Sequence, residues 1–94
     1  MEILWRAAAL NDLEAIRDFI AQDNPQAAAR VRTAIRTAVD RLAQYPEFGR
    51  EGRVPGTREL IVATAPYIVA YRIAEDQVRI LAVIHTSRQW PRRF

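Results

Sequence analysis

The hydrophobic pattern changes from a helical spacing in the first half of the chain to strand-like runs in the second half. In residues 7–23, and again from residue 25 to about residue 45, apolar side chains recur every three or four positions, which is typical of helices with one buried face. Beyond residue 57, short runs of branched apolar residues alternate with turn-forming residues, which indicates strands. The pattern predicts a strand at 2–6, helices at 7–23 and 25–45, a loop at 46–57, strands at 58–64, 67–74 and 78–85, and a tail at 86–94.

The joint between the two predicted helices is very short. Asn24 suits the position that caps a helix, and Pro25 suits the first helical position. So short a joint forces the helices into an antiparallel hairpin. The exposed face of the first helix leans acidic and the second helix carries arginines, so their charges favour the pairing. Exposed ion pairs contribute only about 0–1 kcal/mol each, and burial of the two apolar stripes matters more.

The last three predicted strands are joined by short turns, which require an antiparallel meander. The element order is therefore β-α-α-β-β-β. It predicts an α+β fold of two layers, with the helical hairpin packed on one face of an antiparallel sheet. The pattern leaves open where the strand at 2–6 joins the sheet.

The end of the last strand carries the candidate chemistry. A branched apolar run from Val78 ends in a polar cluster that begins at His85. His85 is suited to acid–base chemistry near neutral pH, but we expect it to cap the strand end by bonding a neighbouring backbone group. Arg88 is suited to binding a phosphate or a carboxylate of a partner protein, and equally to being a solvated tail residue. Trp90 is suited to anchoring a partner, since tryptophan is enriched at interface hot spots, but we expect it to fold back over the sheet.

Further expectations concern the strands at 58–64 and 67–74. Alternation places Tyr67 and Tyr71 on one face and Ile68 and Arg72 on the other. We expect Arg58 and Glu59 to belong to structural ion pairs across the sheet. Arg72 stands among apolar neighbours and should have a partner, for which we predict Glu59.

Composition narrows the class of protein. The chain has 94 residues, enough for one domain with a modest core, and half of them are apolar. It has no cysteine and one histidine, which excludes disulfides, thiolate zinc sites and two-histidine sites, and we expect neither metal nor cofactor. Every basic residue is arginine, but a net charge of +3 is too small to argue for nucleic-acid binding. We see no signal peptide or apolar run long enough to cross a membrane, and expect a cytoplasmic protein.

Several short motifs resemble, in order, those of the RelE/ParE superfamily of toxins from type II toxin–antitoxin modules. They are Trp5 with Asp12-Leu13 and Ile16; Pro46 with Gly49-Arg50; Gly56 with Arg58-Glu59-Leu60; Pro66-Tyr67 with Val69 and Tyr71-Arg72-Ile73; and Val78 with Ile80-Leu81, Val83, His85, Arg88 and Trp90-Pro91. The resemblance covers nearly the whole chain. It implies the layout predicted above, and a small bacterial toxin that forms a hetero-oligomer with a cognate antitoxin. The antitoxin is expected to have an acidic tail and a ribbon-helix-helix DNA-binding domain.

The superfamily divides by mechanism, and the resemblance implies two alternatives. ParE-like members inhibit DNA gyrase, whereas RelE-like members are ribosome-dependent mRNA endoribonucleases. Nuclease members often carry a basic residue at the position where this chain has Ile68, so we favour the ParE-like branch. A non-toxic member kept for repressor complexes is a third possibility.

The site residues follow from these alternatives. We expect the target to contact His85, Arg88 and Trp90. We expect the antitoxin to contact Leu13, Arg17, Arg32 and Arg36. If the chain is a ribonuclease, its catalytic candidates are His85, Arg88, Arg58 and Arg72.

Overall fold

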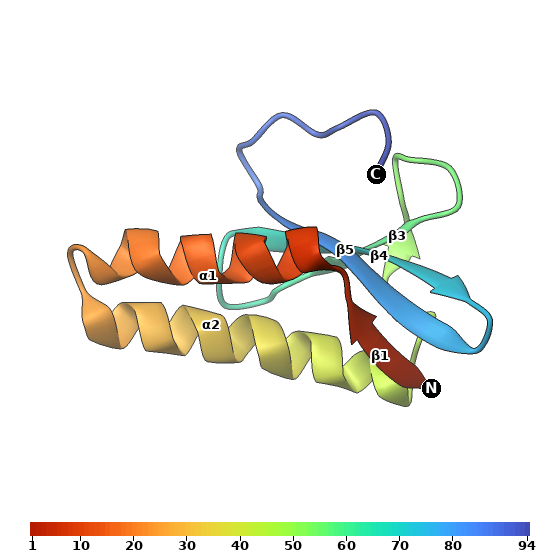
Figure 1. Cartoon of the computed structure of the whole chain (residues 1–94), viewed down its shortest axis with the longest axis horizontal. Coiled ribbons are helices and arrows are strands. Elements are labelled where there is room, and N and C mark those ends of the chain that lie inside the picture. Colours follow the sequence, from red (N-terminus) through yellow and green to blue (C-terminus); the bar gives the residue numbers. More distant parts are fainter.

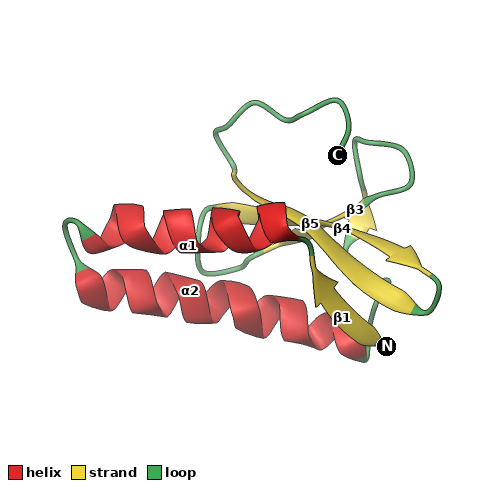
Figure 2. Ribbon diagram, viewed as in Figure 1, coloured by secondary structure: helices red, strands yellow, loops and turns green.

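The computed structural model describes all residues, 1–94, and has two layers, a helical hairpin and a β-sheet (Figures 1 and 2). The sheet has five strands. The strand order across the sheet is β1-β5-β4-β3-β2. The elements are β1 (Glu2–Trp5), α1 (Ala7–Ala21), α2 (Pro25–Asp40), a 3-10 turn (Arg41–Ala43), β2 (Arg50–Glu51), β3 (Arg58–Ile61), β4 (Tyr67–Ala74) and β5 (Gln77–His85). The α+β, two-layer prediction is confirmed.

The helical hairpin forms at the predicted joint. The Asn24 side chain accepts a hydrogen bond from the backbone N–H of Ala27 at 3.0 Å, and Pro25 opens α2. Across the hairpin, Arg32 Nε lies 3.2 Å from a carboxylate oxygen of Glu14. Both helices end earlier than the pattern predicts, α1 at Ala21 and α2 at Asp40. In α2 the chain that follows tightens into a 3-10 turn before Pro46.

The first strand pairs in parallel with the last one. β1 lies at the sheet edge and matches Glu2 with Gln77 through Trp5 with Ile80. Parallel neighbours need a long crossover, which the helical hairpin and the meander provide here. The sheet is therefore mixed, and β1 is too short to cover the second half of β5, from Leu81 to His85.

A bulge in β5 decides which face each of its side chains reaches. Ala70 pairs with Ala82 and Tyr71 pairs with Ile80, so Leu81 is left over. The extra residue shifts the alternation by one position, as bulges do. As a result Ile80 and Val83 both lie in the core beneath the helices, while Leu81 and Ala82 both lie on the opposite face. This explains why the strand reads as an unbroken apolar run.

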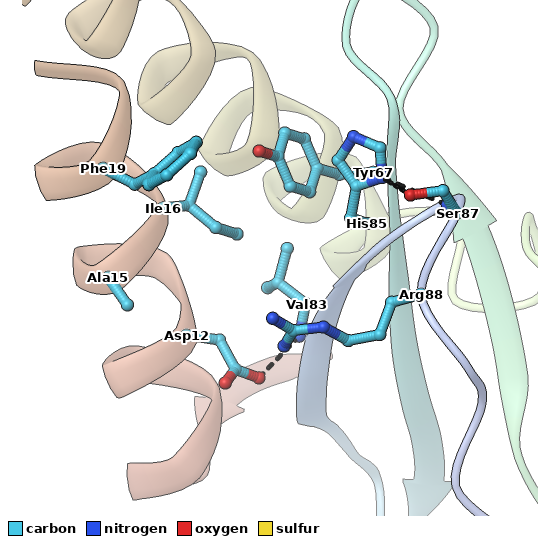
Figure 3. A pocket seen from close by; sticks show the side chains of 9 residues that line it. All are labelled: Asp12, Ala15, Ile16, Phe19, Tyr67, Val83, His85, Ser87 and Arg88. Carbon is cyan, nitrogen blue, oxygen red and sulfur yellow. Dashed lines mark hydrogen bonds between the residues drawn. The ribbon is translucent and has the colours of Figure 1, made fainter.

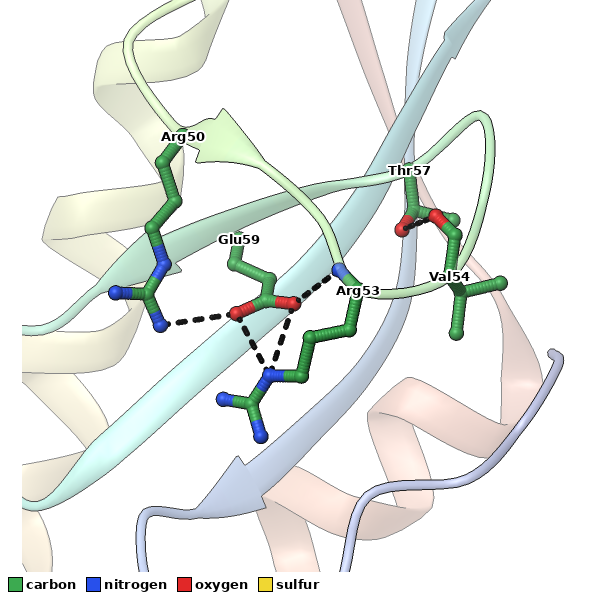
Figure 4. A network of polar contacts seen from close by, with 5 residues as sticks. All are labelled: Arg50, Arg53, Val54, Thr57 and Glu59. Carbon is green, nitrogen blue, oxygen red and sulfur yellow. Dashed lines mark hydrogen bonds and ion pairs between the residues drawn. The ribbon is translucent and has the colours of Figure 1, made fainter.

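The segment predicted as a loop, 46–57, contains the two-residue strand β2, which pairs with β3. Glu59 on β3 is only 1% exposed and holds this segment (Figure 4). It accepts hydrogen bonds from Arg50 at 3.0 Å and from the backbone N–H of Arg53 at 2.8 Å. The predicted ion pairing of Glu59 across the sheet is confirmed, but the prediction that Arg72 is its partner is wrong, because the loop arginines already occupy the carboxylate. The predicted ion pair of Arg58 is also wrong, because its guanidinium donates to two backbone carbonyls instead.

Tyr71 fixes the start of the same segment. Its hydroxyl accepts from the backbone N–H of Gly49 at 2.8 Å and donates to the carbonyl of Pro46 at 2.7 Å. A β-carbon at Gly49 would stand 2.6 Å from the Tyr71 ring, so only glycine allows this approach. Burial raises the pKa of Tyr71, against the Gly49 hydrogen bond and the charge of Arg58, so the hydroxyl stays protonated.

Apolar side chains form two clusters, one on each face of the sheet. The larger cluster lies between the sheet and the helices and contains Leu13, Ile35, Tyr71 and Ile80. The smaller one, on the far face, contains Ala70, Leu81, Ala82 and Ile84, with Trp90 and Phe94 of the tail packed against it. The prediction that Trp90 folds back over the sheet is confirmed. None of the helices has the length and apolar character required to span a bilayer.

Candidate partner-binding groove

A groove of about 550 Å³ runs between α1 and the end of β5 (Figure 3). α1 contributes an apolar wall, and the end of β5 with the start of the tail contributes the polar side. The lining residues are Asp12, Ala15, Ile16, Phe19, Tyr67, Val83, His85, Ser87 and Arg88. Phe19 is 71% exposed, so the free chain shows an aromatic ring to solvent beside this groove.

Asp12 closes part of the open edge of β5. Beyond the reach of β1, the backbone N–H of Val83 donates to the Asp12 carboxylate at 3.0 Å. A side chain of α1 thus supplies the acceptor that a neighbouring strand would otherwise supply. This bond also fixes the distance between α1 and β5, and with it the width of the groove.

His85 lies at the end of β5 with one ring nitrogen engaged. Its Nδ1 accepts from the backbone N–H of Ser87 at 3.1 Å and lies 2.8 Å from the Ser87 hydroxyl. A backbone N–H can only donate, so Nδ1 carries no proton in this arrangement and Nε2 is the remaining donor. The ring meets Tyr67 edge-on, with centroids 5.2 Å apart. The prediction that His85 caps the strand end through a neighbouring backbone group is confirmed.

Tyr67 and Arg88 set the electrostatics of the groove. Burial raises the pKa of Tyr67, and the positive charge of Arg88 opposes this only in part, so Tyr67 is neutral near pH 7. The Arg88 guanidinium extends towards the groove (Figure 3). It has no hydrogen bond or ion pair with another side chain, and the dashed line beside it joins Asp12 to the backbone N–H of Val83. No three carboxylate or histidine side chains come together anywhere in the chain in a way that could hold a metal ion.

Comparison with known proteins shows which family shares this architecture. The family model described as "ParE toxin of type II toxin-antitoxin system, parDE" matches residues 3–90. The chain belongs to the ParE toxin family. It is 53% identical to the "Putative toxin Y4kP" of Sinorhizobium fredii, over 95% of this chain and 92% of that protein. It is 42% identical to "Toxin RelE2" of Caulobacter vibrioides, over 93% and 97%. The resemblance found in the motifs is confirmed.

Solved structures agree on the fold of this ParE-family toxin. A chain from "Chromosomal ParDE TA system from P. aeruginosa" superposes with a TM-score of 0.81 at 27% identity, covering 90% of this chain and 95% of that one. A chain of the toxin–antitoxin complex RelBE2 from Mycobacterium tuberculosis superposes with a TM-score of 0.58 at 24% identity, over 89% and 88%, and shares the fold.

The ParE-family toxin brings together two of the three residues expected to contact a target. His85 and Arg88 both line the groove. Trp90 lies on the other face of the sheet, where the Arg53 guanidinium stands 4.1 Å above its ring. Trp90 is therefore a structural anchor of the tail in this conformation.

The four ribonuclease candidates do not converge. Arg58 donates to the carbonyls of Glu47 and Gly49 and so holds the 46–57 segment. Arg72 lies opposite Arg79 in the register of β4 with β5, on the face of the sheet away from the helices. His85 pairs with Tyr67, five positions along β4 from Arg72, which is about 17 Å at about 3.4 Å per residue. Only His85 and Arg88 share a site.

The residues expected to contact an antitoxin lie on the hairpin, with one exception. Leu13 is fully buried in the core, so it supports the surface from beneath and is no contact residue, which corrects the prediction. Arg17 pairs with Glu14 and Asp18, and Arg32 pairs with Glu14. Arg36 stands 5.8 Å above the ring of Trp5. These three arginines stay accessible at their outer ends.

Sequence reasoning missed the α1 side of the groove, namely Asp12, Ile16 and Phe19. A signal was present, because the apolar stripe of α1 is wider than its core contact. Of its apolar residues only Ala9 and Leu13 are buried, whereas Leu10 and Phe19 are exposed. An apolar stripe with more members than the core can cover indicates a surface for a partner.

Proposed function

We propose that this ParE-family toxin acts by binding a macromolecular target, and that the target is DNA gyrase. The observation that supports the proposal is which side chains the groove contains and which of them are already engaged. Its histidine has one ring nitrogen engaged by Ser87, and two of the arginines that RNA cleavage would recruit lie outside it. The likeness to a chain titled as part of a ParDE system supports the same branch.

The chemistry of RNA cleavage explains why the groove favours binding. Cleavage needs a base for the 2′-hydroxyl, an acid for the leaving oxygen and cations around the phosphate. Tyr67 stays protonated near pH 7 because burial raises its pKa, so no phenolate is available to act as the base. Arg88 is the one arginine that lines this groove, so the groove itself offers a single cation to a phosphoryl transition state.

The same groove is well suited to a protein partner. Phe19 and Ile16 form an apolar contact surface on one wall, and Arg88 contributes a positively charged guanidinium group on the other. Aromatic and arginine side chains dominate the energetics of protein interfaces. The groove therefore has the composition of a small interface centred on α1 and the end of β5.

We further propose that a cognate antitoxin neutralises the toxin by covering the helical hairpin. Arg17, Arg32 and Arg36 present guanidinium groups there, and Phe19 and Leu10 leave apolar surface exposed. An acidic segment that folds on binding fits both features. Its apolar side chains would cover the exposed residues while its carboxylates approach the arginines.

A supercoiling assay tests the gyrase proposal. The full-length wild-type chain should inhibit supercoiling by purified gyrase. Arg88→Gln should need about tenfold more protein for the same inhibition, since it removes a charged contact at the centre of the groove. Arg30→Gln is the matched control, because Arg30 is exposed on α2 and has no side-chain partner. Unchanged supercoiling at saturating wild-type protein would refute gyrase as the target.

The ribonuclease alternative has one observation in its favour beyond the name of the Caulobacter relative. His85 keeps Nε2 free beside Arg88 in an open groove. If the binding proposal holds, the wild-type chain should leave a defined mRNA on ribosomes uncut. Cleavage that disappears in His85→Asn, with supercoiling untouched, would replace gyrase with the ribosome as the target.

A further inference from the structure

A second hollow, of about 350 Å³, lies under the tail and adjoins the groove between α1 and β5, with which it shares Asp12, Val83 and Arg88. In Figure 1 the tail leaves β5 and arches back over the sheet towards the β2–β3 loop. Three arginines from three separate segments line the hollow. Arg6 precedes α1, Arg88 follows β5, and Arg93 lies one residue from the chain end. The fold thus brings arginines that are far apart in sequence to one hollow.

These three arginines have no counter-charge of their own. None of them makes a side-chain hydrogen bond or ion pair, whereas Arg17, Arg32, Arg50, Arg53 and Arg79 all do. The one side-chain carboxylate in the hollow belongs to Asp12, and it already accepts the Val83 N–H. Three lining side chains are positive and one is negative, and the main-chain carboxylate of Phe94 reduces the excess to one positive charge, which still favours an anion.

The rest of the lining indicates which anion fits. Leu81, Pro91 and Phe94 form an apolar wall beside the arginines, and the Phe94 ring is part of it. Guanidinium groups bind phosphate oxygens in a bidentate manner. An aromatic ring beside them allows a base to stack, a combination typical of sites for single-stranded nucleic acid.

We propose that Arg6, Arg88 and Arg93 bind a phosphate group of a single-stranded nucleic acid, whose neighbouring base or sugar contacts the apolar wall. The hollow is large enough for a phosphate with its sugar. The two sites share Arg88, but Arg6 and Arg93 line only this hollow, so substitutions at Arg6 and Arg93 test this proposal separately from the gyrase proposal.

Fluorescence anisotropy with a labelled oligothymidylate of about ten nucleotides tests the proposal with neither gyrase nor ribosome present. The test variant is Arg6→Gln/Arg93→Gln, which retains Arg88. The matched control is Arg30→Gln/Arg41→Gln, two exposed arginines on and just after α2. Both variants lower the net charge from +3 by two, to +1.

The test and control double variants should differ clearly in their affinity for the oligonucleotide. We expect the test variant to bind about tenfold more weakly and the control to change by less than about twofold. The slope of log K against log salt should become shallower by about 1.4 in the test variant, because two phosphate contacts at about 0.7 each are lost. Should the double variant fail to fold, Arg93→Gln in the tail gives the same test with a slope change of about 0.7.

Three results would overturn the proposal. Equal weakening in both double variants would mean a general charge effect. Tight binding of inorganic phosphate alone, as strong as that of the oligonucleotide, would keep the phosphate site and reject the strand. A glutamate-rich peptide that binds more tightly than the oligonucleotide, with the same dependence on Arg6 and Arg93, would make the hollow a carboxylate site for an acidic protein.

Discussion

Glu59 is the residue on which the irregular segment 46–57 depends. It is a nearly fully buried carboxylate, which is costly unless every oxygen is satisfied. Burial by itself raises its pKa, but the hydrogen bonds from the Arg53 backbone and from Arg50, together with the charges of both arginines, outweigh burial and hold the pKa below its ordinary value of 4.5. Ionised Glu59 therefore joins β2, the following turn and β3.

Glu59→Gln should lower the free energy of unfolding by about 2–3 kcal/mol near pH 7, because charge-assisted hydrogen bonds are lost. A lowered pKa in the folded chain means that the contribution is fully present above the unfolded pKa and is lost as the pH falls through the folded pKa. The difference between variant and wild type, measured by urea unfolding, should thus shrink well below pH 4.5. Glu51→Gln, exposed on β2, is the control, and an equal effect there would contradict the assignment.

At the scale of elements, the turn between β4 and β5 shows backbone strain. Ala74 pairs with Gln77, so the turn has two central residues, Glu75 and Asp76, and both have positive φ, 54° and 59°. Turns of this kind match the twist of the strands and favour Asn-Gly, because side chains make positive φ costly. This hairpin also positions the whole of β5, including its end at His85.

Asp76→Gly should raise the free energy of unfolding by about 0.5–1 kcal/mol, since glycine adopts positive φ without the steric cost. Thermal unfolding should show a melting temperature higher by about 2–8 °C. Asp23→Gly is the control, because Asp23 lies in the α1–α2 turn without positive φ, and there glycine only adds freedom to the unfolded chain. A gain at Asp23 equal to that at Asp76 would reject strain as the cause.

At the scale of the whole molecule, the two faces of the sheet are covered by different parts of the chain. The helical hairpin covers one face, and the tail covers part of the other through Trp90 and Phe94. Arg53 stands over the Trp90 ring and also binds Glu59, so the tail is joined to the 46–57 segment. The indole Nε1 of Trp90 is buried without a hydrogen-bond partner. The tail is held by ring packing and the arginine contact, and the indole N–H contributes nothing.

Two substitutions at Trp90 separate these contributions. Trp90→Ala should lower the free energy of unfolding by about 2 kcal/mol and expose the apolar far face to a hydrophobic dye. Trp90→Phe keeps a ring and removes the unpartnered N–H, so it should change stability by less than about 0.5 kcal/mol. Chemical denaturation checks both. Equal losses in the two variants would mean that the indole nitrogen has a partner after all.

Much of the fold could be predicted from local patterns. The helix joint at Asn24-Pro25 and the two last strands follow from capping residues and periodicity, which act over a few residues. β2 escaped prediction because two residues carry no period, and its pairing depends on Glu59 binding Arg50 and Arg53 across the hairpin. Of the groove, His85 and Arg88 were predicted from the polar end of the last strand, whereas Asp12 and Phe19 were not, because their part in it depends on where α1 packs against β5.

By itself the sequence determined the element order, the helical hairpin, the meander and membership of the toxin family. These depend on side-chain periodicity, turn residues and motifs that lie within short stretches of chain. Only the tertiary structure decided that β1 lies beside β5, that Leu81 bulges, and that Arg6 and Arg93 meet from opposite ends of the chain. The physical reason is range. The pairing of β1 with β5 and the placing of Arg6 beside the same hollow as Arg93 join residues more than seventy positions apart, and the bulge at Leu81 depends on the register between β4 and β5, so no local pattern records them.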